Sequence, residues 1–127
     1  MLLGQWIAVG AGAAIGAWLR WGLGLMFNET HPMLALGTLL ANLLGGYLMG
    51  LAIGIFALSP SVSPEVKLFI MTGMLGGLTT FSAFSAEGVN LITRGQYAWA
   101  ATHILVHVIL SLAMTGLGIF TIQFIKG

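Results

Sequence analysis

Four long apolar stretches, separated by short polar loops, constrain this chain more than any other feature of its sequence. They cover about residues 5–27, 33–58, 66–92 and 97–124, and a helix needs about 20 apolar residues to cross a bilayer. Only 6% of the residues are charged and 58% are hydrophobic, whereas about 25% are charged in soluble domains. The sequence therefore predicts an all-α membrane protein, a single domain of four transmembrane helices over residues 1–127.

The third stretch contains a run that is unusual inside a membrane helix, TGMLGGLTTFSAFS at residues 72–85. Glycine weakens a helix by about 1 kcal/mol relative to alanine. Gly73 and Gly77 alone, spaced as G-x-x-x-G, are typical of close packing between helices. For the whole run we expect a break in the helix that handles an ion, because freed backbone carbonyls survive in a membrane where they have a partner.

Polar side chains also occur inside the first two stretches. Arg20 either extends toward the headgroups or faces protein or water. Thr38 and Asn42 are four residues apart and share a helix face. The amide of Asn42 either bonds a neighbouring helix or donates its N–H groups to an anion.

The fourth stretch carries a polar stripe, His103, His107, Ser111 and Thr115, at steps of four residues. Such a stripe either lines water or meets another helix. Two histidines one turn apart can chelate a metal, but no carboxylate or third histidine joins them within this stretch, so a zinc site is not expected. Glu87 is expected near the far interface or in a vestibule.

The cationic residues favour neither orientation in the membrane. Lys67 and Lys126 lie on one side of a four-span arrangement. Arg94 lies on the other side, and Arg20 is nearer to that second side. The positive-inside rule therefore has no bias to act on. Copies in opposite orientations would pair through glycine faces, so the sequence predicts an antiparallel dual-topology homodimer.

The polar residues narrow the class of function. No nucleophile–base pair, carboxylate pair or phosphate-binding loop is present, so an enzyme is not expected, and no basic cluster indicates nucleic acid. A small proton-coupled exporter of drugs or cations needs a carboxylate in mid-membrane, and the first, second and fourth stretches have none. The charged and polar groups expected near mid-membrane are Arg20, Asn42 and side-chain hydroxyls. These are cationic or neutral hydrogen-bond donors, and they favour an anion channel. The small exporter and a non-transporting assembly subunit remain alternatives.

Three segments resemble the CrcB-type, or Fluc, fluoride channels: GGLTTFSAF at 76–84, GTLLANLLG at 37–45 and GAWLRW at 16–21. The resemblance implies a passive fluoride-selective channel that exports cytoplasmic fluoride and so confers fluoride resistance. It also implies a multi-pass protein of the bacterial inner membrane that forms an antiparallel homodimer with two pores.

The resemblance further implies roles for individual residues. Arg20 would lie near the vestibule, and the backbone carbonyls of Gly76 and Thr79 would coordinate a structural sodium ion at the centre of the dimer. Ring edges of two phenylalanines and the amide of one asparagine would meet fluoride. The expected fluoride pore comprises Phe81, Phe84, Asn42, Thr38, Ser82, His107, Ser111 and Thr115.

Overall fold

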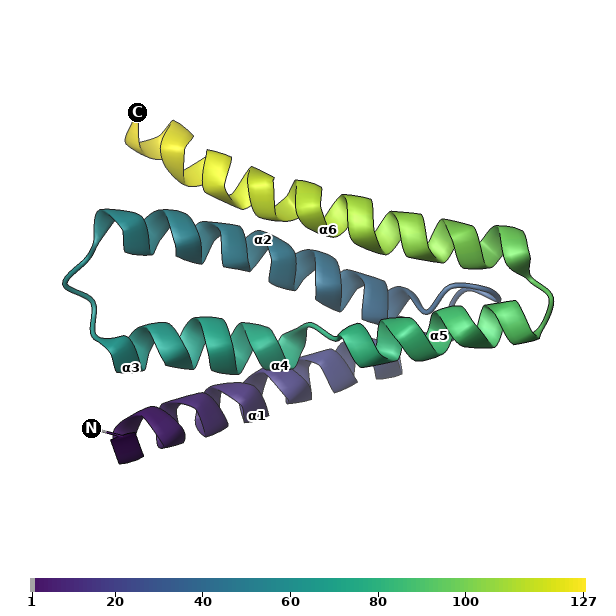
Figure 1. Ribbon diagram of the computed structural model, residues 1–127, viewed down its shortest axis with the longest axis horizontal. Helices are drawn as coiled ribbons and strands as arrows, with labels where there is room; N and C mark the ends of the chain where they lie inside the picture. The colour runs from purple at the N-terminus through teal and green to yellow at the C-terminus, as the bar shows by residue number, and fades with distance from the viewer. Residues whose placement is uncertain (1) are drawn as a thin grey trace.

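The computed structural model describes residues 2–127 and folds into helices joined by short loops (Figure 1). The elements are α1 (Leu2–Phe27), α2 (Leu36–Leu58), α3 (Pro64–Lys67), the π-helical segment η1 (Leu68–Leu75), α4 (Gly76–Leu78), α5 (Phe81–Thr93) and α6 (Tyr97–Lys126). Among the described residues, four helices are long and apolar enough to cross a membrane, the third being Pro64–Thr93. Both chain ends lie at the same end of the molecule (Figure 1), as an even number of crossings requires.

The second helix begins later than the sequence predicts. We expected it from about residue 33, with Pro32 in its first turn, but α2 begins at Leu36. The reason is the side chain of His31, whose Nδ1 accepts the N–H groups of Met33 and Leu34, at 3.0 Å each. These contacts hold the segment after Pro32 in a loop, because they satisfy N–H groups that would otherwise seek a helix.

Glycines bring the first and third spans into backbone contact. A Cβ built on Gly73 would lie 2.7 Å from the carbonyl oxygen of Val9, and one on Gly77 would lie 2.5 Å from that of Ala13. On the other side of the interface, Gly12 is buried and a Cβ there would lie 2.8 Å from the backbone nitrogen of Met74. Close packing therefore explains Gly73 and Gly77, as small residues in membrane helices permit.

Helices α2 and α6 meet through a second glycine pair. A Cβ on Gly50 would lie 2.9 Å from Cα of Gly118, and one on Gly118 would collide with the carbonyl oxygen of Tyr47. One turn further along, a Cβ on Gly54 would lie 2.8 Å from Cβ of Ile122. Gly50 and Gly54 of α2 thus form part of the smooth face that α6 covers.

We expect Gly118→Ala to lower the thermal unfolding midpoint of the purified protein, because the added methyl must push apart two backbones, and overpacking costs about 1–3 kcal/mol. Gly116→Ala is the matched control on the same helix, since a Cβ there has nothing within 4 Å in the chain. The midpoint is measured in detergent by circular dichroism. Equal midpoints for the two variants would contradict the packing described for α2 and α6.

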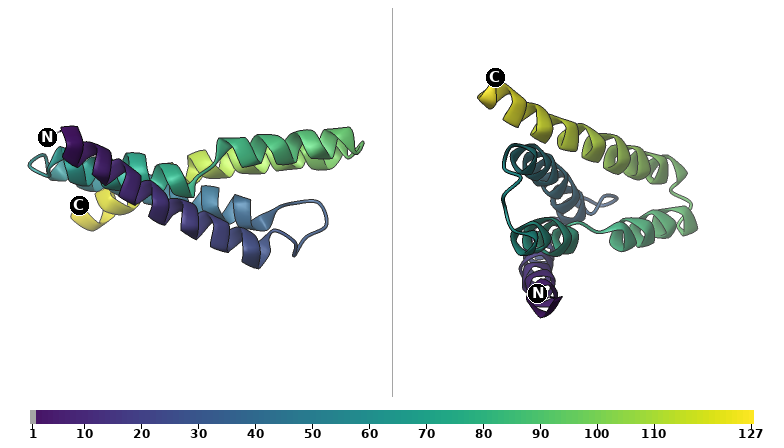
Figure 2. Two further views of the ribbon diagram at one scale, coloured as in Figure 1. Left: turned by 90° about the horizontal axis from the view of Figure 1, so that it is seen from below. Right: turned by 60° about the vertical axis from the view of Figure 1, so that its left-hand side comes forward.

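The third span is broken between α4 and α5. Thr79 and Thr80 adopt extended backbone angles, with φ −86° and ψ 157° for Thr79 and φ −150° and ψ 123° for Thr80. Oγ1 of Thr80 then caps α5 by accepting the N–H of Ala83 at 3.1 Å. The expected break is confirmed, and beyond it α5 and the start of α6 diverge from α1 (Figure 2).

Candidate functional site

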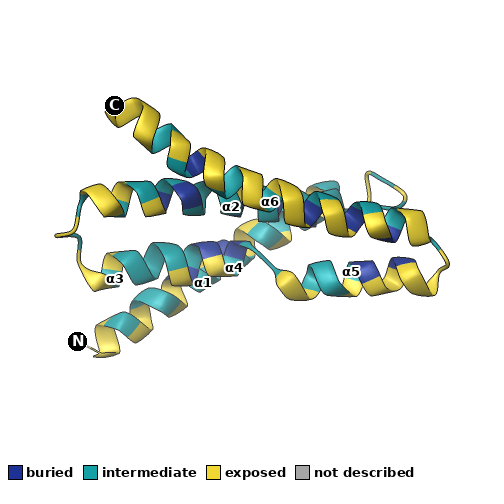
Figure 3. Ribbon diagram, turned by 45° about the horizontal axis from the view of Figure 1, so that its top comes forward, coloured by how far each residue is buried: buried dark blue, intermediate teal, exposed yellow. Residues whose placement is uncertain are grey.

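A groove of about 440 Å³ runs along the break, between α2, the third span and α6. Buried residues line the inner sides of these helices, whereas their outer faces are largely exposed (Figure 3). Six of the eight expected pore residues lie on the groove, and Thr38 and Ser82 do not. The groove is lined by Asn42, Gly45, Gly46, Met49, Leu75, Gly76, Thr79, Thr80, Phe81, Phe84, His107, Val108, Ser111, Leu112 and Thr115.

Asn42 binds the broken backbone from α2. Its Oδ1 accepts the N–H of Thr80 at 2.7 Å, and its Nδ2 donates to the carbonyl oxygen of Thr80 at 3.2 Å. Because the backbone N–H can only donate and the carbonyl can only accept, these two bonds fix which end of the amide is which. Asn42 therefore satisfies the N–H that the break exposes at Thr80 and also binds the carbonyl of the same residue.

The same amide fixes the tautomer of His107. Nδ2 of Asn42 also lies 3.1 Å from Nδ1 of His107, and an amide NH₂ group only donates. Nδ1 of His107 is thus the acceptor, so the neutral ring carries its proton on Nε2. His107 is only 5% exposed and lines the groove, which leaves a ring N–H donor inside the apolar span.

Phe81 and Phe84 lie together at the start of α5, with ring centroids 5.4 Å apart. The ring of Phe84 stacks on His103 at 4.9 Å and contacts His107 at the same centroid distance. Phe84 is half-buried, whereas Phe81 is 79% exposed. The edge of an aromatic ring carries the positive end of its quadrupole, so both rings are suited to contact an anion.

Of the serine and threonine residues predicted for the pore, some line the groove and others lie outside it. Ser111 and Thr115 line the groove, and Oγ1 of Thr115 donates to the carbonyl oxygen of Gly46 at 2.9 Å. Ser82 is exposed, with its Oγ 3.2 Å from Oγ1 of Thr80. The stripe on α6 therefore both meets another helix and lines the groove.

Arg20 and Thr38 lie on a second cavity of about 500 Å³, whose lining also includes Glu29 and Glu87. Nε of Arg20 donates to the carbonyl oxygen of Gly77 at 3.0 Å, so the guanidinium group binds the backbone next to the break. Oγ1 of Thr38 donates to Oε2 of Glu87 at 2.7 Å. Thr38 thus belongs to this cavity rather than to the groove with Asn42.

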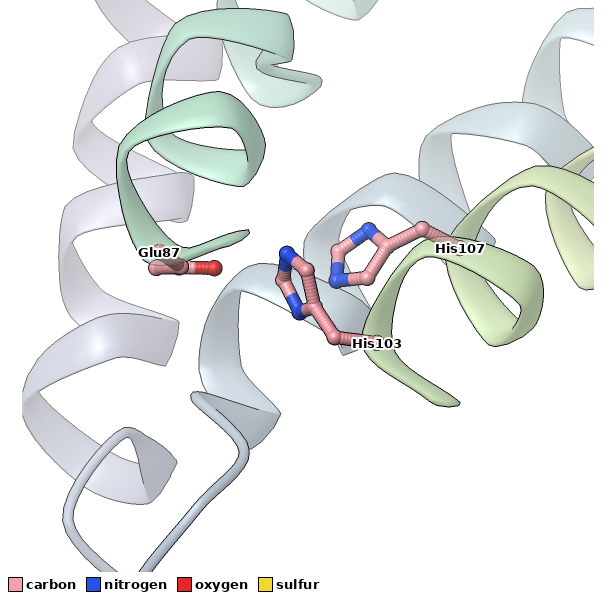
Figure 4. Close-up of side chains that lie close together, drawn as sticks. All are labelled: Glu87, His103 and His107. Atoms are coloured by element: carbon pink, nitrogen blue, oxygen red, sulfur yellow. The ribbon is translucent and has the colours of Figure 1, made fainter. Parts of the chain in front are cut away.

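Glu87 is expected near the far interface or in a vestibule, and it does line the second cavity, but the sequence prediction did not bring it to the histidines of α6. Its carboxylate and one ring nitrogen each of His103 and His107 lie within 4.8 Å of one another (Figure 4). We expected no carboxylate to join these histidines, because the fourth span contains none, but α5 brings one from the third span. The sequence does contain a pattern that indicates this position. Glu87 follows Phe84 by three residues, and helix periodicity puts both side chains on one face.

The break also releases backbone carbonyls, among them those of Gly76 and Thr79. In a continuous helix the N–H of Thr80 would bond the carbonyl of Gly76, and that of Ala83 would bond the carbonyl of Thr79. Instead these N–H groups bond Oδ1 of Asn42 and Oγ1 of Thr80. The carbonyl oxygens of Gly76 and Thr79 therefore lack these helical N–H partners, and such oxygens are suitable ligands for a cation.

Comparison with known proteins gives one consistent result. The family described as CrcB-like protein, Camphor Resistance (CrcB), matches residues 7–119. The chain is 55% identical over 126 residues to a protein of Pseudomonas putida strain W619 named fluoride-specific ion channel FluC, with 99% of each chain covered. Proteins of the same name from Thiobacillus denitrificans and Nitrosospira multiformis are 52% and 57% identical, covering 94% and 93% of this chain and 97% and 92% of theirs. This multi-pass membrane protein therefore belongs to the CrcB-like family.

Proposed function

We propose that the protein is a passive, fluoride-selective channel that carries cytoplasmic fluoride out of the cell and so confers fluoride resistance. Its relatives named fluoride-specific ion channels match it over more than nine-tenths of its length. The observation that carries the proposal is the groove, which combines amide, imidazole and hydroxyl donors with two phenylalanine rings and has no lysine or arginine in its lining.

That donor set suits a small, strongly hydrated anion. A dehydrated pore must replace the ion's water with hydrogen-bond donors, yet it must bind weakly enough for the ion to leave. Amide, hydroxyl and ring-edge groups carry only partial charges, whereas a fixed cation would hold fluoride in place. The groove therefore favours passage of fluoride over tight binding.

We assign roles to the residues on this basis. The ring edges of Phe81 and Phe84 contact fluoride, Asn42 and His107 donate N–H groups, and Ser111 and Thr115 continue the polar path along α6. Ser82 lies next to the cap of α5, and Thr38 lies at the second cavity. That cavity serves as a vestibule whose cation is Arg20.

A structural sodium ion at the break is part of the proposal. The released carbonyls of Gly76 and Thr79 supply oxygen ligands, and a cation there would also favour an anion nearby. When sodium is replaced by N-methyl-D-glucamine throughout purification and assay, we expect fluoride efflux to fall and to return when sodium is added. Unchanged efflux without sodium would remove the ion from the proposal.

We further propose that the channel is an antiparallel homodimer of the bacterial inner membrane. The ring of Phe81 lines the groove and is 79% exposed, so a second copy that covers the groove would bury it. The chain has no cysteine, so Gly127→Cys gives a single thiol at the C-terminus. Impermeant thiol reagents applied to intact cells should label about half of the copies, because dual topology puts both ends on each side. Labelling of all copies or of none would exclude dual topology.

The experiment that tests the function is fluoride efflux from liposomes that contain the purified protein. A fluoride electrode records efflux while valinomycin and potassium set the voltage, and chloride-loaded liposomes are the control. We expect rapid fluoride efflux and no chloride efflux. A folded protein that moves no fluoride would contradict the channel and return the small exporter and the assembly subunit as explanations.

A further inference from the structure

We propose that Glu87, His103 and His107 form a binding site for a divalent transition-metal ion, with zinc as the fitting ion. The three ligand atoms lie within 4.8 Å of one another (Figure 4). Zinc holds nitrogen and oxygen ligands at about 2.0–2.2 Å, and two histidines with one carboxylate are a known zinc-binding set. Ligand atoms around such an ion are about 3.3–3.6 Å apart, so small side-chain rotations bring these three together.

The contacts around the cluster support a cation. Oε1 of Glu87 is buried with no hydrogen-bond partner among the described residues, while Oγ1 of Thr38 holds the other carboxylate oxygen. Nε2 of His103, the ring nitrogen nearer Glu87 in Figure 4, lies 2.9 Å from the carbonyl oxygen of Phe84. Because that carbonyl can only accept, the neutral ring carries its proton on Nε2, and a metal ion bound to Nε2 would replace the contact with Phe84.

The position of the cluster makes a bound ion an inhibitor. Glu87 lines the second cavity and His107 lines the groove, so an ion that enters from the cavity would sit between the two. It would occupy the path that the proposed function assigns to fluoride. Zinc should therefore block efflux, and this consequence alone rests on the proposed function.

Zinc competes with Asn42 for His107. Because Nδ1 of His107 accepts from Asn42, its Nε2 is protonated and must lose that proton before it can bind zinc. Nδ1 then takes up a proton and faces the NH₂ group of Asn42, which is itself held by Thr80. Zinc binding thus costs the contact between His107 and Asn42, so removing the amide should strengthen binding.

The first test measures zinc binding to the purified full-length protein by isothermal titration calorimetry, independently of transport. We expect one ion per chain in the parent and an affinity at least about 100-fold lower in His103→Gln and Glu87→Gln, because second-shell changes alone cost about 10- to 100-fold. Glutamine in place of His103 retains an N–H for the carbonyl of Phe84. His31→Asn, in the loop outside the cluster, is the control and should bind like the parent. Absence of saturable binding, or equal binding in all variants, would overturn the site.

Asn42→Ala tests the assignment of His107 by zinc affinity. The expected change is a gain in affinity, which loss of structure in the variant would not produce. Its zinc affinity should rise about 10-fold, the size of a typical effect from a neighbour of a metal ligand. Lower affinity in this variant would overturn the assignment of His107 as the third ligand.

The second test repeats fluoride efflux with added zinc, each variant being compared with its own zinc-free rate. Zinc should inhibit the parent and His31→Asn but not His103→Gln. If zinc binds as described but the parent moves no fluoride, the proposed function fails and the metal site stands. If fluoride moves but zinc neither binds nor inhibits, the metal site fails and the channel stands.

Discussion

Phe84→Ile and Phe81→Ile will each lower fluoride efflux by about 10- to 100-fold. A hydrogen-bond-like contact to a charged group is worth about 1.5–3 kcal/mol, and each 1.4 kcal/mol changes a rate about tenfold. Isoleucine retains an apolar side chain but has no ring edge. The larger loss is expected for Phe84, because its ring also contacts His103 and His107 at centroid distances of 4.9 Å.

The control for these variants is Phe120→Ile, which changes an aromatic ring that is 58% exposed on α6 and outside the groove. It should conduct like the parent. Thermal unfolding of all three variants shows whether they are folded, and liposome efflux then compares their rates. If Phe81→Ile and Phe84→Ile are folded and conduct at the parent rate, fluoride does not contact the rings.

Much of the fold follows from local sequence patterns. Apolar length predicts the four spans, and the spacing of Gly73 and Gly77 predicts a face on which two helices meet. The pairing of Thr79 with Thr80 after two glycines predicts the break, since such residues leave a helix easily. Each of these signals lies within a single segment of the chain, so no partner segment is needed to read them.

The rest of the site depends on contacts between distant segments. Glu87 binds Thr38 from α2 and approaches His103 from α6, and the spacing within any single span says nothing of such neighbours. Arg20 likewise finds the carbonyl of Gly77 on another helix. Sequence reasoning placed Arg20 near a vestibule and Glu87 near the far interface or in a vestibule. It placed Thr38 in the pore with Asn42, whereas Thr38 lies on the cavity that Arg20 and Glu87 line.

Asn42→Ala should lower fluoride efflux by at least about 10-fold and also lower the unfolding midpoint. It leaves the N–H and the carbonyl of Thr80 without the partners that now lie at 2.7 and 3.2 Å, and each unpaired buried polar group costs about 1–3 kcal/mol. Asn90→Ala, an exposed asparagine on α5, is the matched control and should change neither quantity.

Asn42→Asp separates the support of the break from contact with the ion. An aspartate retains an acceptor for the N–H of Thr80 but has no N–H to donate, and its charge repels an anion. We expect it to regain part of the stability that Asn42→Ala loses while its efflux stays low. If Asn42→Asp recovers efflux together with stability, Asn42 only holds the backbone at Thr80. If Asn42→Ala conducts at the parent rate, neither role stands.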